Sequence, residues 1–248
     1  MISNPTVSII TVAYNSAATI ARTIESVAAQ SVPPMEYLII DGASKDNTVE
    51  VAESFRNILK DKGIIYKVIS EPDNGIYDAM NKGISMATGD IIGIINSDDW
   101  YEPIAVETVI NTYREDPFDM FYADLRIHMG GGRSFVKHSR ERRHATSRDW
   151  NHPTTFITKE IYSEHRYKTE TQHDDYDLIL RLKKLGIKAV VRNVVLANFT
   201  MNGVSHERNL KKAVERVKIK YSIYRNNGYS PLYFCECFVE ELGKLIIG

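Results

Sequence analysis

The stretch IIGIINSDDW, residues 91–100, decides the fold, because it joins a strongly apolar run to two adjacent carboxylates. The run IIGII predicts a buried strand, and Asp98 and Asp99 follow it directly after Asn96 and Ser97. Paired acids at the end of a buried strand require a counter-charge. From this stretch alone the counter-charge could be a metal ion, a basic side chain or only solvent.

Three further apolar runs, at residues 7–12, 37–40 and 64–70, predict strands, and residues 76–87 have helical spacing. Strands that alternate with helices predict a mostly parallel sheet whose faces are covered. Ligands bind such sheets beyond the carboxyl ends of the strands. Polar or acidic residues stand at that edge three times, in the segments Ala13-Tyr14-Asn15, Asp41-Gly42-Ala43-Ser44 and Asn96-Ser97-Asp98-Asp99.

Beyond residue 120 the pattern changes. A GGG turn between FYADLRIHM and RSFVKH predicts a hairpin, residues 174–185 a helix, and residues 188–199 a closing pair of strands. The basic segment 133–148 is either a solvated loop or a contact for an anionic acceptor or a membrane surface. A basic amphipathic helix begins at Glu207. Its predicted apolar face could pack on the core, bind a second copy or lie on lipid, and consists of Leu210, Val214, Val217, Tyr221 and Tyr224.

Composition narrows the class of protein. The chain has 248 residues and 43% hydrophobic content, enough for one sizeable domain, and a formal net charge of -1, which argues against a nucleic-acid partner. Cys235 and Cys237 form no disulfide framework, and no apolar run approaches the ~20 residues of a spanning helix. We therefore expect a cytoplasmic protein, with any membrane contact peripheral. The motifs of Rossmann dehydrogenases, P-loop NTPases and α/β-hydrolases are missing.

The acidic residues permit specific chemistry. Carboxylates at a strand end can hold Mg²⁺ or Mn²⁺ together with substrate phosphates, although an isolated Asp-Asp pair is more often a solvated turn. Asp41 could accept a hydrogen bond from a nucleobase such as uracil, or could belong to a simple turn. In HDDYD, residues 173–177, one acid could cap the following helix and another could act as a general base.

Four segments together resemble family 2 glycosyltransferases. They are VSIITVAYNSAATIARTIESVAAQS (7–31), YLIIDGASKDNT (37–48), EPDNGIYDAMNKGISMATGDIIGIINSDDW (71–100) and HDDYDLILRL (173–182). The third is more similar to the branch that builds bacterial surface polysaccharides. The resemblance covers about residues 5–206 and implies a GT-A fold, which is α/β with a mostly parallel, Rossmann-like central sheet flanked by helices. It also implies a GT-A domain over 1–205, with nucleotide-sugar binding in 1–123 and the acceptor side in 124–205. A C-terminal helical extension over 206–248 follows.

The resemblance also implies site residues. The nucleotide-sugar would contact Thr11, Ala13, Tyr14, Asp41, Asp73, Lys82, Asn96, Ser97 and Asp98. A Mg²⁺ or Mn²⁺ ion would be held by Asp98, Asp99 and His206. The catalytic base would be Asp175, with Asp174 as the alternative. The acceptor and the diphosphate would be bordered by His152, Asn202, Gly203 and Ser205.

The implied reaction is an inverting transfer of a hexose or N-acetylhexosamine. The sugar would pass from a nucleotide-sugar donor, UDP-linked by this reading, to a hydroxyl of a glycan or lipid-linked saccharide. Asn96 departs from the family pattern, because it stands where the first Asp of the DxD motif is usual. This departure keeps open a non-catalytic member that binds nucleotide or assembles with other proteins. A sugar nucleotidyltransferase is the other alternative, although AYNSAAT stands where such enzymes carry a Gly-rich loop.

Overall fold

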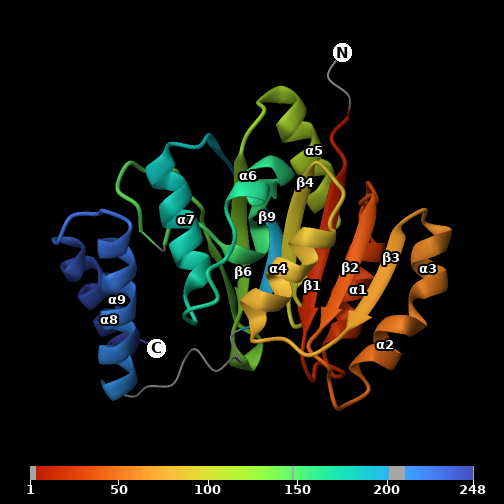
Figure 1. Cartoon of the computed structure of the whole chain (residues 1–248), viewed down its shortest axis with the longest axis horizontal. Helices are drawn as coiled ribbons and strands as arrows, with labels where there is room; N and C mark the ends of the chain where they lie inside the picture. The colour runs from red at the N-terminus through yellow and green to blue at the C-terminus, as the bar shows by residue number, and fades with distance from the viewer. Residues whose placement is uncertain (1–3, 147, 201–209, 248) are drawn as a thin grey trace.

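The first four strands form the parallel half of a central sheet. The computed structural model describes residues 4–146, 148–200 and 210–247, and Figure 1 shows the sheet with helices on both faces. Its first strands are β1 (Val7–Ala13), β2 (Glu36–Asp41), β3 (Ile65–Ser70) and β4 (Ile91–Asn96). They lie in the order β3-β2-β1-β4 and all pair in parallel. The predicted strands are therefore confirmed, and their carboxyl ends meet at one edge.

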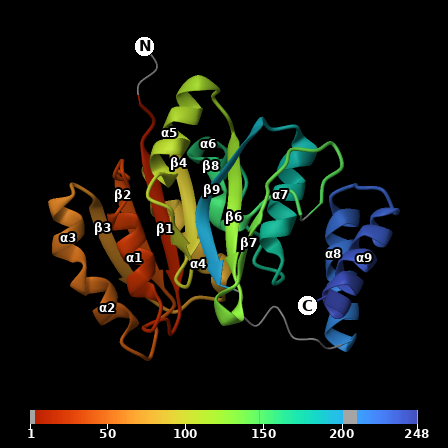
Figure 2. The same cartoon turned by 180° about the vertical axis from the view of Figure 1, so that it is seen from behind.

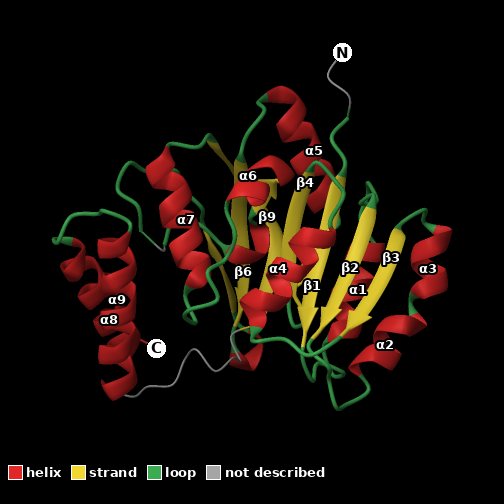
Figure 3. Cartoon of the chain, viewed as in Figure 1, coloured by secondary structure: helices red, strands yellow, loops and turns green. Residues whose placement is uncertain are grey.

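Helices cover both faces of this half because their apolar stripes match it. One face packs against α1 (Ile20–Ala28), α2 (Thr48–Ser54), α3 (Arg56–Asp61) and α5 (Ala105–Glu115). The other packs against α4 (Ile76–Met86), the helix predicted for 76–87. A Cβ on Gly83 would lie 2.6 Å from Cγ2 of Ile10, so only glycine lets α4 approach β1 this closely. Figure 3 shows these layers by secondary structure.

The second half of the sheet is mixed. Its strands are β5 (Trp100–Tyr101), β6 (Met120–His128), β7 (Ser134–Lys137), β8 (Phe156–Thr158) and β9 (Ala189–Thr200). β8 joins the halves by pairing antiparallel with both β4 and β6, and β6 pairs with β9 in parallel. The predicted hairpin is β6 and β7, joined by the 3-10 turn η1 (Gly130–Gly132).

The prediction of two closing strands over residues 188–199 was wrong. This segment forms one strand of 12 residues, β9, which runs along β6. It contains no Gly or Pro to make a turn, and its irregularity is taken up by shifts of register opposite Asp124.

The remaining helices stand at the far side of the sheet. They are the 3-10 turn η2 (His152–Thr154), α6 (Lys159–Glu164), α7 (Asp174–Leu185), α8 (Leu210–Asn226) and α9 (Tyr233–Ile247). The predicted helix 174–185 is confirmed as α7. Figure 2 shows α8 and α9 side by side beyond α7, at the opposite end of the molecule from α3. None of the helices in the described residues is long and apolar enough to cross a membrane.

The face predicted for the basic helix divides in two. Tyr224 is fully buried, and its hydroxyl accepts a hydrogen bond from the Tyr176 hydroxyl of α7 at 2.5 Å. Leu210 and Val214, at the other end of α8, are 71% and 46% exposed. Only the end of α8 that contacts α7 therefore serves the core.

Candidate active site

A cavity of about 940 Å³ opens at the carboxyl ends of β1 and β4. This is the sheet edge at which the sequence predicted a ligand. Its wall is formed by the loop after β1, the turn after β2, the start of α4 and the end of β4. The lining residues are Val12, Ala13, Tyr14, Asn15, Ser16, Ala18, Thr19, Gly42, Pro72, Asp73, Gly75, Ile76, Ala79, Asn96, Ser97 and Asp98.

The sequence-predicted nucleotide-binding residues divide between the wall and the layer behind it. The wall includes Ala13, Tyr14, Asp73, Asn96, Ser97 and Asp98. The prediction that Thr11 lines the pocket was wrong, because its side chain is fully buried and its hydroxyl lies 2.9 Å from that of Tyr37. Lys82 also lies outside the wall. Its ammonium donates to the carbonyl of Pro72 at 2.7 Å and pairs with Glu71 at 3.0 Å, so it holds the loop that carries Asp73.

Asp41 lies behind the wall and organises the turn after β2. Its Oδ2 accepts hydrogen bonds from the backbone amide of Ser44 at 2.9 Å and from the Ser70 hydroxyl at 2.6 Å. Its Oδ1 accepts from the Ser44 hydroxyl. The carboxylate is 1% exposed and does not border the cavity, whereas its neighbour Gly42 does.

Gly42 and Asp73 touch across the cavity wall. Asp73 Oδ1 accepts from the backbone amide of Gly75 at 2.9 Å, which fixes the carboxylate at the start of α4. A Cβ added to Gly42 would stand 2.5 Å from Asp73 Oδ2 and 3.4 Å from the ring of Tyr14. A larger residue here would displace the Asp73 carboxylate, a close approach that the sequence pattern of a turn did not reveal.

Asn96, Ser97 and Asp98 form the wall at the end of β4. Ser97 donates from its hydroxyl to that of Ser16 at 2.8 Å, and Asp98 is exposed to the cavity. The Asn96 Oδ1 is buried and has no hydrogen-bond partner among the described residues. Arg22 braces this segment from α1, because its guanidinium donates to the Asp98 carbonyl at 2.7 Å and stacks on Trp100 at 3.7 Å.

Asp99 does not face the cavity, contrary to its predicted place beside a metal. It is fully buried, and neither carboxylate oxygen has a hydrogen-bond partner in the described part of the chain. Burial, and then the neighbouring Asp98, raise its pKa well above the usual range. The nearby Arg22 guanidinium opposes this rise but does not cancel it. A side chain in this position favours a neutral carboxyl.

The cavity fits a divalent ion that arrives with phosphates. Among residues 4–146, 148–200 and 210–247, no three His, Cys, Asp or Glu side chains gather as a metal-binding group. Two carboxylates, Asp73 and Asp98, line the cavity, and its described lining contains no Lys or Arg. The Asn96 Oδ1, which has no hydrogen-bond partner among the described residues, adds a neutral oxygen ligand. Mg²⁺ and Mn²⁺ are commonly held by one or two carboxylates plus substrate phosphates, so this oxygen-rich wall suits such an ion.

The two acids at the start of α7 have different surroundings. Asp174 is 2% exposed, and its carboxylate accepts hydrogen bonds from the backbone amides of Glu170 and Thr171 and from the Thr171 hydroxyl. Asp175 is half-buried, and its Oδ1 accepts from the Tyr77 hydroxyl at 2.9 Å. Tyr77 stacks on Tyr167, with ring centroids 5.2 Å apart, and follows Ile76 of the cavity wall. Tyr77 therefore links the wall of the large cavity to Asp175.

Asp175 borders a second cleft of about 300 Å³, lined by residues of β6, β9, η2, α7 and α8. Most of its wall is apolar, and cationic or titratable side chains stand among the apolar ones. The lining residues are Leu125, Ile127, Lys137, Trp150, Asn151, His152, Pro153, His173, Asp175, Tyr176, Phe199 and Lys220. Asp175 is the one carboxylate in this described lining.

His152 and Asp175 both line an enclosed void of about 10 Å³. The His152 Nε2 is buried there and has no hydrogen-bond partner among the described residues. Burial lowers the pKa of His152, and the nearby Asp175 carboxylate opposes that change. A void of this size is about that needed for one water molecule, which could bridge the imidazole and the carboxylate.

The remaining predicted residues fall outside the described part of the chain. They are Asn202, Gly203, Ser205 and His206. Sequence reasoning also missed several residues that the fold brings to the clefts. Tyr77 and Gly42 lie inside the segments that resemble the family, but the predicted roles were assigned to neighbouring residues. Lys137, Tyr176 and Lys220 come from separate elements, and no spacing in the sequence connects them.

The sequence profile of glycosyl transferase family 2 matches residues 8–181, more than half of the chain. The chain belongs to glycosyl transferase family 2. The resemblance is confirmed, and the matched region contains both Asp98 and Asp175. It ends within α7, before α8 and α9.

Curated relatives support the assignment. The chain is 34% identical to the PGL/p-HBAD biosynthesis glycosyltransferase of Mycobacterium bovis over 123 residues, which are 49% of this chain and 47% of that protein. It is 30% identical to the chondroitin synthase of Pasteurella multocida over 190 residues, 73% of this chain and 19% of that protein. The chain thus spans about half or less of the length of these relatives.

Solved structures confirm the GT-A fold. The Staphylococcus aureus protein TarS 1-349, in complex with UDP, has a TM-score of 0.68 at 17% identity, covering 98% of this chain and 72% of that one. The mannosyltransferase PcManGT from Pyrobaculum calidifontis, in complex with GDP-Man and Mn²⁺, also scores 0.68, at 14% identity, covering 98% and 70%.

Proposed function

We propose that this family 2 member is a metal-dependent, inverting glycosyltransferase. It would move a sugar from a nucleotide-sugar to a hydroxyl of a glycan or lipid-linked saccharide in bacterial surface-polysaccharide synthesis. The observation that carries the proposal is the hydrogen bond of 2.9 Å between Tyr77 and Asp175, because it joins the wall of the large cavity to a half-buried carboxylate in a separate cleft. Donor and acceptor sites would then meet at this carboxylate.

The donor would occupy the cavity of about 940 Å³, within the nucleotide-sugar half assigned to residues 1–123. A diphosphate placed beside Asp73 and Asp98 would repel both carboxylates, so it requires a cation. Asp98, with the Asn96 oxygen nearby, would hold Mg²⁺ or Mn²⁺ against the diphosphate, and that ion would offset the charge of the leaving group. The solved GT-A structures bind UDP in one case and GDP-Man in the other, so the nucleobase that this chain binds must be found by experiment.

Asp175 would act as the general base. It alone supplies a carboxylate to the described acceptor-side cleft, and Tyr77 occupies one of its oxygens, which leaves the other to receive the proton of an acceptor hydroxyl. Asp174 would position the helix start, because its three hydrogen bonds tie it to the turn before α7. The acceptor hydroxyl, deprotonated by this single base, would attack the anomeric carbon from the side opposite the departing diphosphate. One such displacement inverts the configuration at that carbon.

The acceptor would bind the cleft of about 300 Å³, within the half assigned to residues 124–205 together with Lys220 of the extension. Trp150, Tyr176 and Phe199 offer apolar and aromatic surface there, which suits the apolar face of a sugar ring. The relatives named for chondroitin synthase and PGL/p-HBAD biosynthesis support a saccharide product.

Calorimetry of nucleotide binding tests the donor site. UDP and GDP are titrated with and without Mn²⁺ into wild type, Asp98→Ala and the control Asp61→Ala, which removes an exposed acid on α3. We expect metal-dependent binding of UDP that only Asp98→Ala abolishes. Binding of GDP but not UDP would refute only the assignment of uracil as the nucleobase. Binding of neither nucleotide would favour a non-catalytic member.

Turnover tests the base. Release of UDP from a UDP-sugar in the presence of acceptor saccharides is compared for wild type, Asp175→Asn and Asp174→Asn. Losing a general base costs about 10²–10⁴ in rate, so we expect that loss for Asp175→Asn with UDP affinity unchanged. Full activity of Asp175→Asn would exclude this mechanism. In a separate assay, release of pyrophosphate from a nucleoside triphosphate and a sugar 1-phosphate would identify a nucleotidyltransferase instead.

A further inference from the structure

The outer face of α9 carries a stripe of exposed apolar side chains. Phe234, Phe238 and Leu242 follow one another at four-residue spacing and are 48%, 51% and 42% exposed. Leu232 and Val239 beside them are 78% and 56% exposed. Contiguous exposed apolar surface on a soluble domain is uncommon and marks a contact site.

The opposite face of α9 packs on α8, and the two helices form a hairpin. Arg216 of α8 pairs with Glu241 of α9 at 2.6 Å, and Lys220 pairs with Glu240 at 2.7 Å and with Glu241 at 3.1 Å. Cys237 is 1% exposed on this side. The apolar stripe is therefore not a core face that has been left unpacked, because α9 already buries another face.

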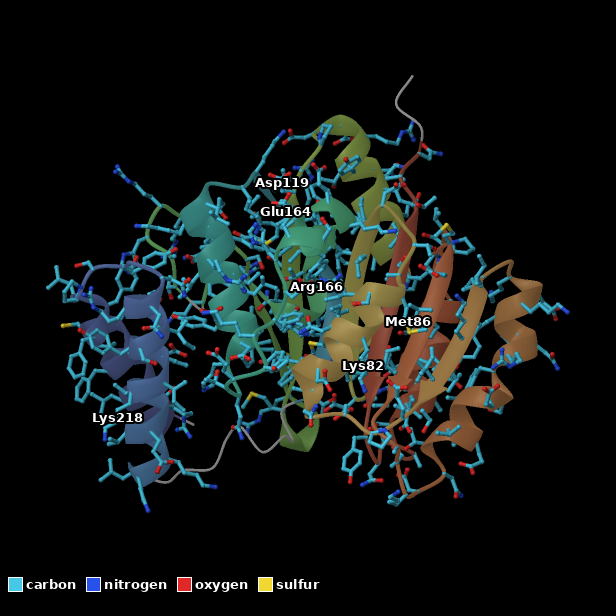
Figure 4. The ribbon with its side chains drawn as sticks, in the orientation of Figure 1. Lys82, Met86, Asp119, Glu164, Arg166 and Lys218 are labelled. Carbon is cyan, nitrogen blue, oxygen red and sulfur yellow. The ribbon has the colours of Figure 1, made fainter. Side chains whose placement is uncertain are left out.

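Cations adjoin the stripe on α8. The Tyr221 ring of α8 meets Phe234 edge to face at 5.5 Å, which places this side of α8 beside the stripe. Lys218, three residues before Tyr221 on the same helix, points away from the sheet on the outer side of α8 (Figure 4). It is exposed to solvent.

The basic segment reaches the same face from the β6–β7 hairpin. The His144 ring stacks on Tyr233, the first residue of α9, with centroids 4.6 Å apart and planes 6° apart. Arg140, Arg143 and Arg148 of this loop are exposed. Its acid, Glu141, pairs with Lys183 of α7 at 3.1 Å. The loop thus brings exposed arginines to the end of the apolar stripe.

We propose that α9, the outer side of α8 and the loop residues 140–146 and 148 form a docking face for an anionic lipid bilayer. An apolar stripe embeds in the interface while neighbouring cations meet lipid phosphates, and the two contributions together give stable but reversible attachment. Charge decides against a second copy as the occupant. Two-fold pairing of this face would bring Lys218 and the arginines of one copy toward those of the other.

Docking in this way leaves the acceptor-side cleft at the same end of the molecule as the bilayer, on the inner side of α8. Lys220, which pairs with Glu240 and Glu241 on the inner side of the hairpin, also lines the cleft that contains Asp175. A saccharide carried on a membrane lipid would then reach the cleft without leaving the surface. The docking proposal itself does not depend on the identity of the acceptor.

Vesicle flotation tests the proposal. The full chain is mixed with vesicles of phosphatidylcholine alone, or of phosphatidylcholine mixed with the anionic lipid phosphatidylglycerol, at low and high salt. We expect flotation only with the anionic vesicles, lost at high salt. The variant Phe234→Ser/Phe238→Ser should reduce partitioning at least about tenfold. Arg140→Gln/Arg143→Gln/Lys218→Gln should reduce it about fivefold for each cation removed.

A matched control comes from the opposite end of the molecule. Ile58→Ser/Lys60→Gln changes an exposed apolar residue and an exposed cation on α3, and should float like wild type. Circular dichroism and UDP binding confirm that each variant is folded. Absence of flotation with anionic vesicles, or flotation that survives both sets of substitutions, overturns the proposal. A dimer by light scattering that Phe234→Ser/Phe238→Ser converts to a monomer would assign the face to a second copy instead.

Discussion

Gly42→Ala should weaken nucleotide binding through Asp73. The new Cβ would stand 2.5 Å from Asp73 Oδ2, whereas ordinary contact begins at 3.4 Å, so the carboxylate must retreat by about 0.9 Å. That movement breaks its hydrogen bond of 2.9 Å from the Gly75 amide. A hydrogen bond to a charged group contributes about 1.5–3 kcal/mol, so we expect UDP affinity to fall roughly tenfold to hundredfold.

A double-mutant cycle tests this reasoning by calorimetry. Asp73→Ala alone should cause a similar loss, and adding Gly42→Ala to Asp73→Ala should cause little more, because the atom that clashes is gone. Gly130→Ala is the control, since a Cβ there meets nothing within 4 Å. If Gly42→Ala costs as much in the Asp73→Ala background as in wild type, the clash with Asp73 is not the cause. Thermal unfolding of each variant separates loss of binding from loss of folding.

Three further predictions concern the buried polar groups. Tyr77→Phe keeps the ring but removes the hydrogen bond to Asp175. It should lower kcat about tenfold with UDP affinity unchanged, whereas Tyr162→Phe, measured alongside by steady-state kinetics, should leave kcat near wild type. Asp99→Asn should raise the free energy of unfolding in urea by about 1–3 kcal/mol, because it removes a buried carboxylate without partners. It should also keep metal-dependent UDP binding, and loss of that binding would restore Asp99 as a ligand. Burial lowers the pKa of His152, so the unfolded chain takes up a proton below about pH 6.5 that the folded protein resists. The free energy of unfolding should therefore fall more between about pH 6.5 and pH 5 for wild type than for His152→Gln, and equal slopes would contradict the burial argument.

The parallel half of the sheet was predictable because its signals are local. The runs around Ile10, Leu38 and Ile94 are rich in apolar residues, and their bounding polar residues mark the predicted binding edge. The second half carries weaker signals. β9 was divided in two because Asn193 interrupts an apolar run, and only its pairing with β6 shows that the strand continues through a shift of register.

Site residues that lie in a recognisable motif could be predicted from the sequence. The prediction failed where packing sets the direction of a side chain. Asp98 and Asp99 are adjacent in sequence, yet alternation along the chain sends Asp98 to the cavity and Asp99 into the core. At the start of α7, Asp174 is likewise buried, whereas Asp175 borders the second cleft. Tyr77 could not be assigned, since its partner lies 98 positions away.

One attachment of the C-terminal extension lies next to the residue proposed as the base. Tyr176 and Asp177, the two residues after Asp175, contact α8 and the residue that follows it, through Tyr224 at 2.5 Å and Asn227 at 2.8 Å. The family match ends at residue 181, so these contacts come from a part of the chain that the matched region does not include. The residue proposed as the base thus lies in the matched region, whereas its next two neighbours are held by residues outside that region. The same α8 supplies Lys220 to the acceptor-side cleft, so variation in the extension can change acceptor choice while the donor cavity stays as it is.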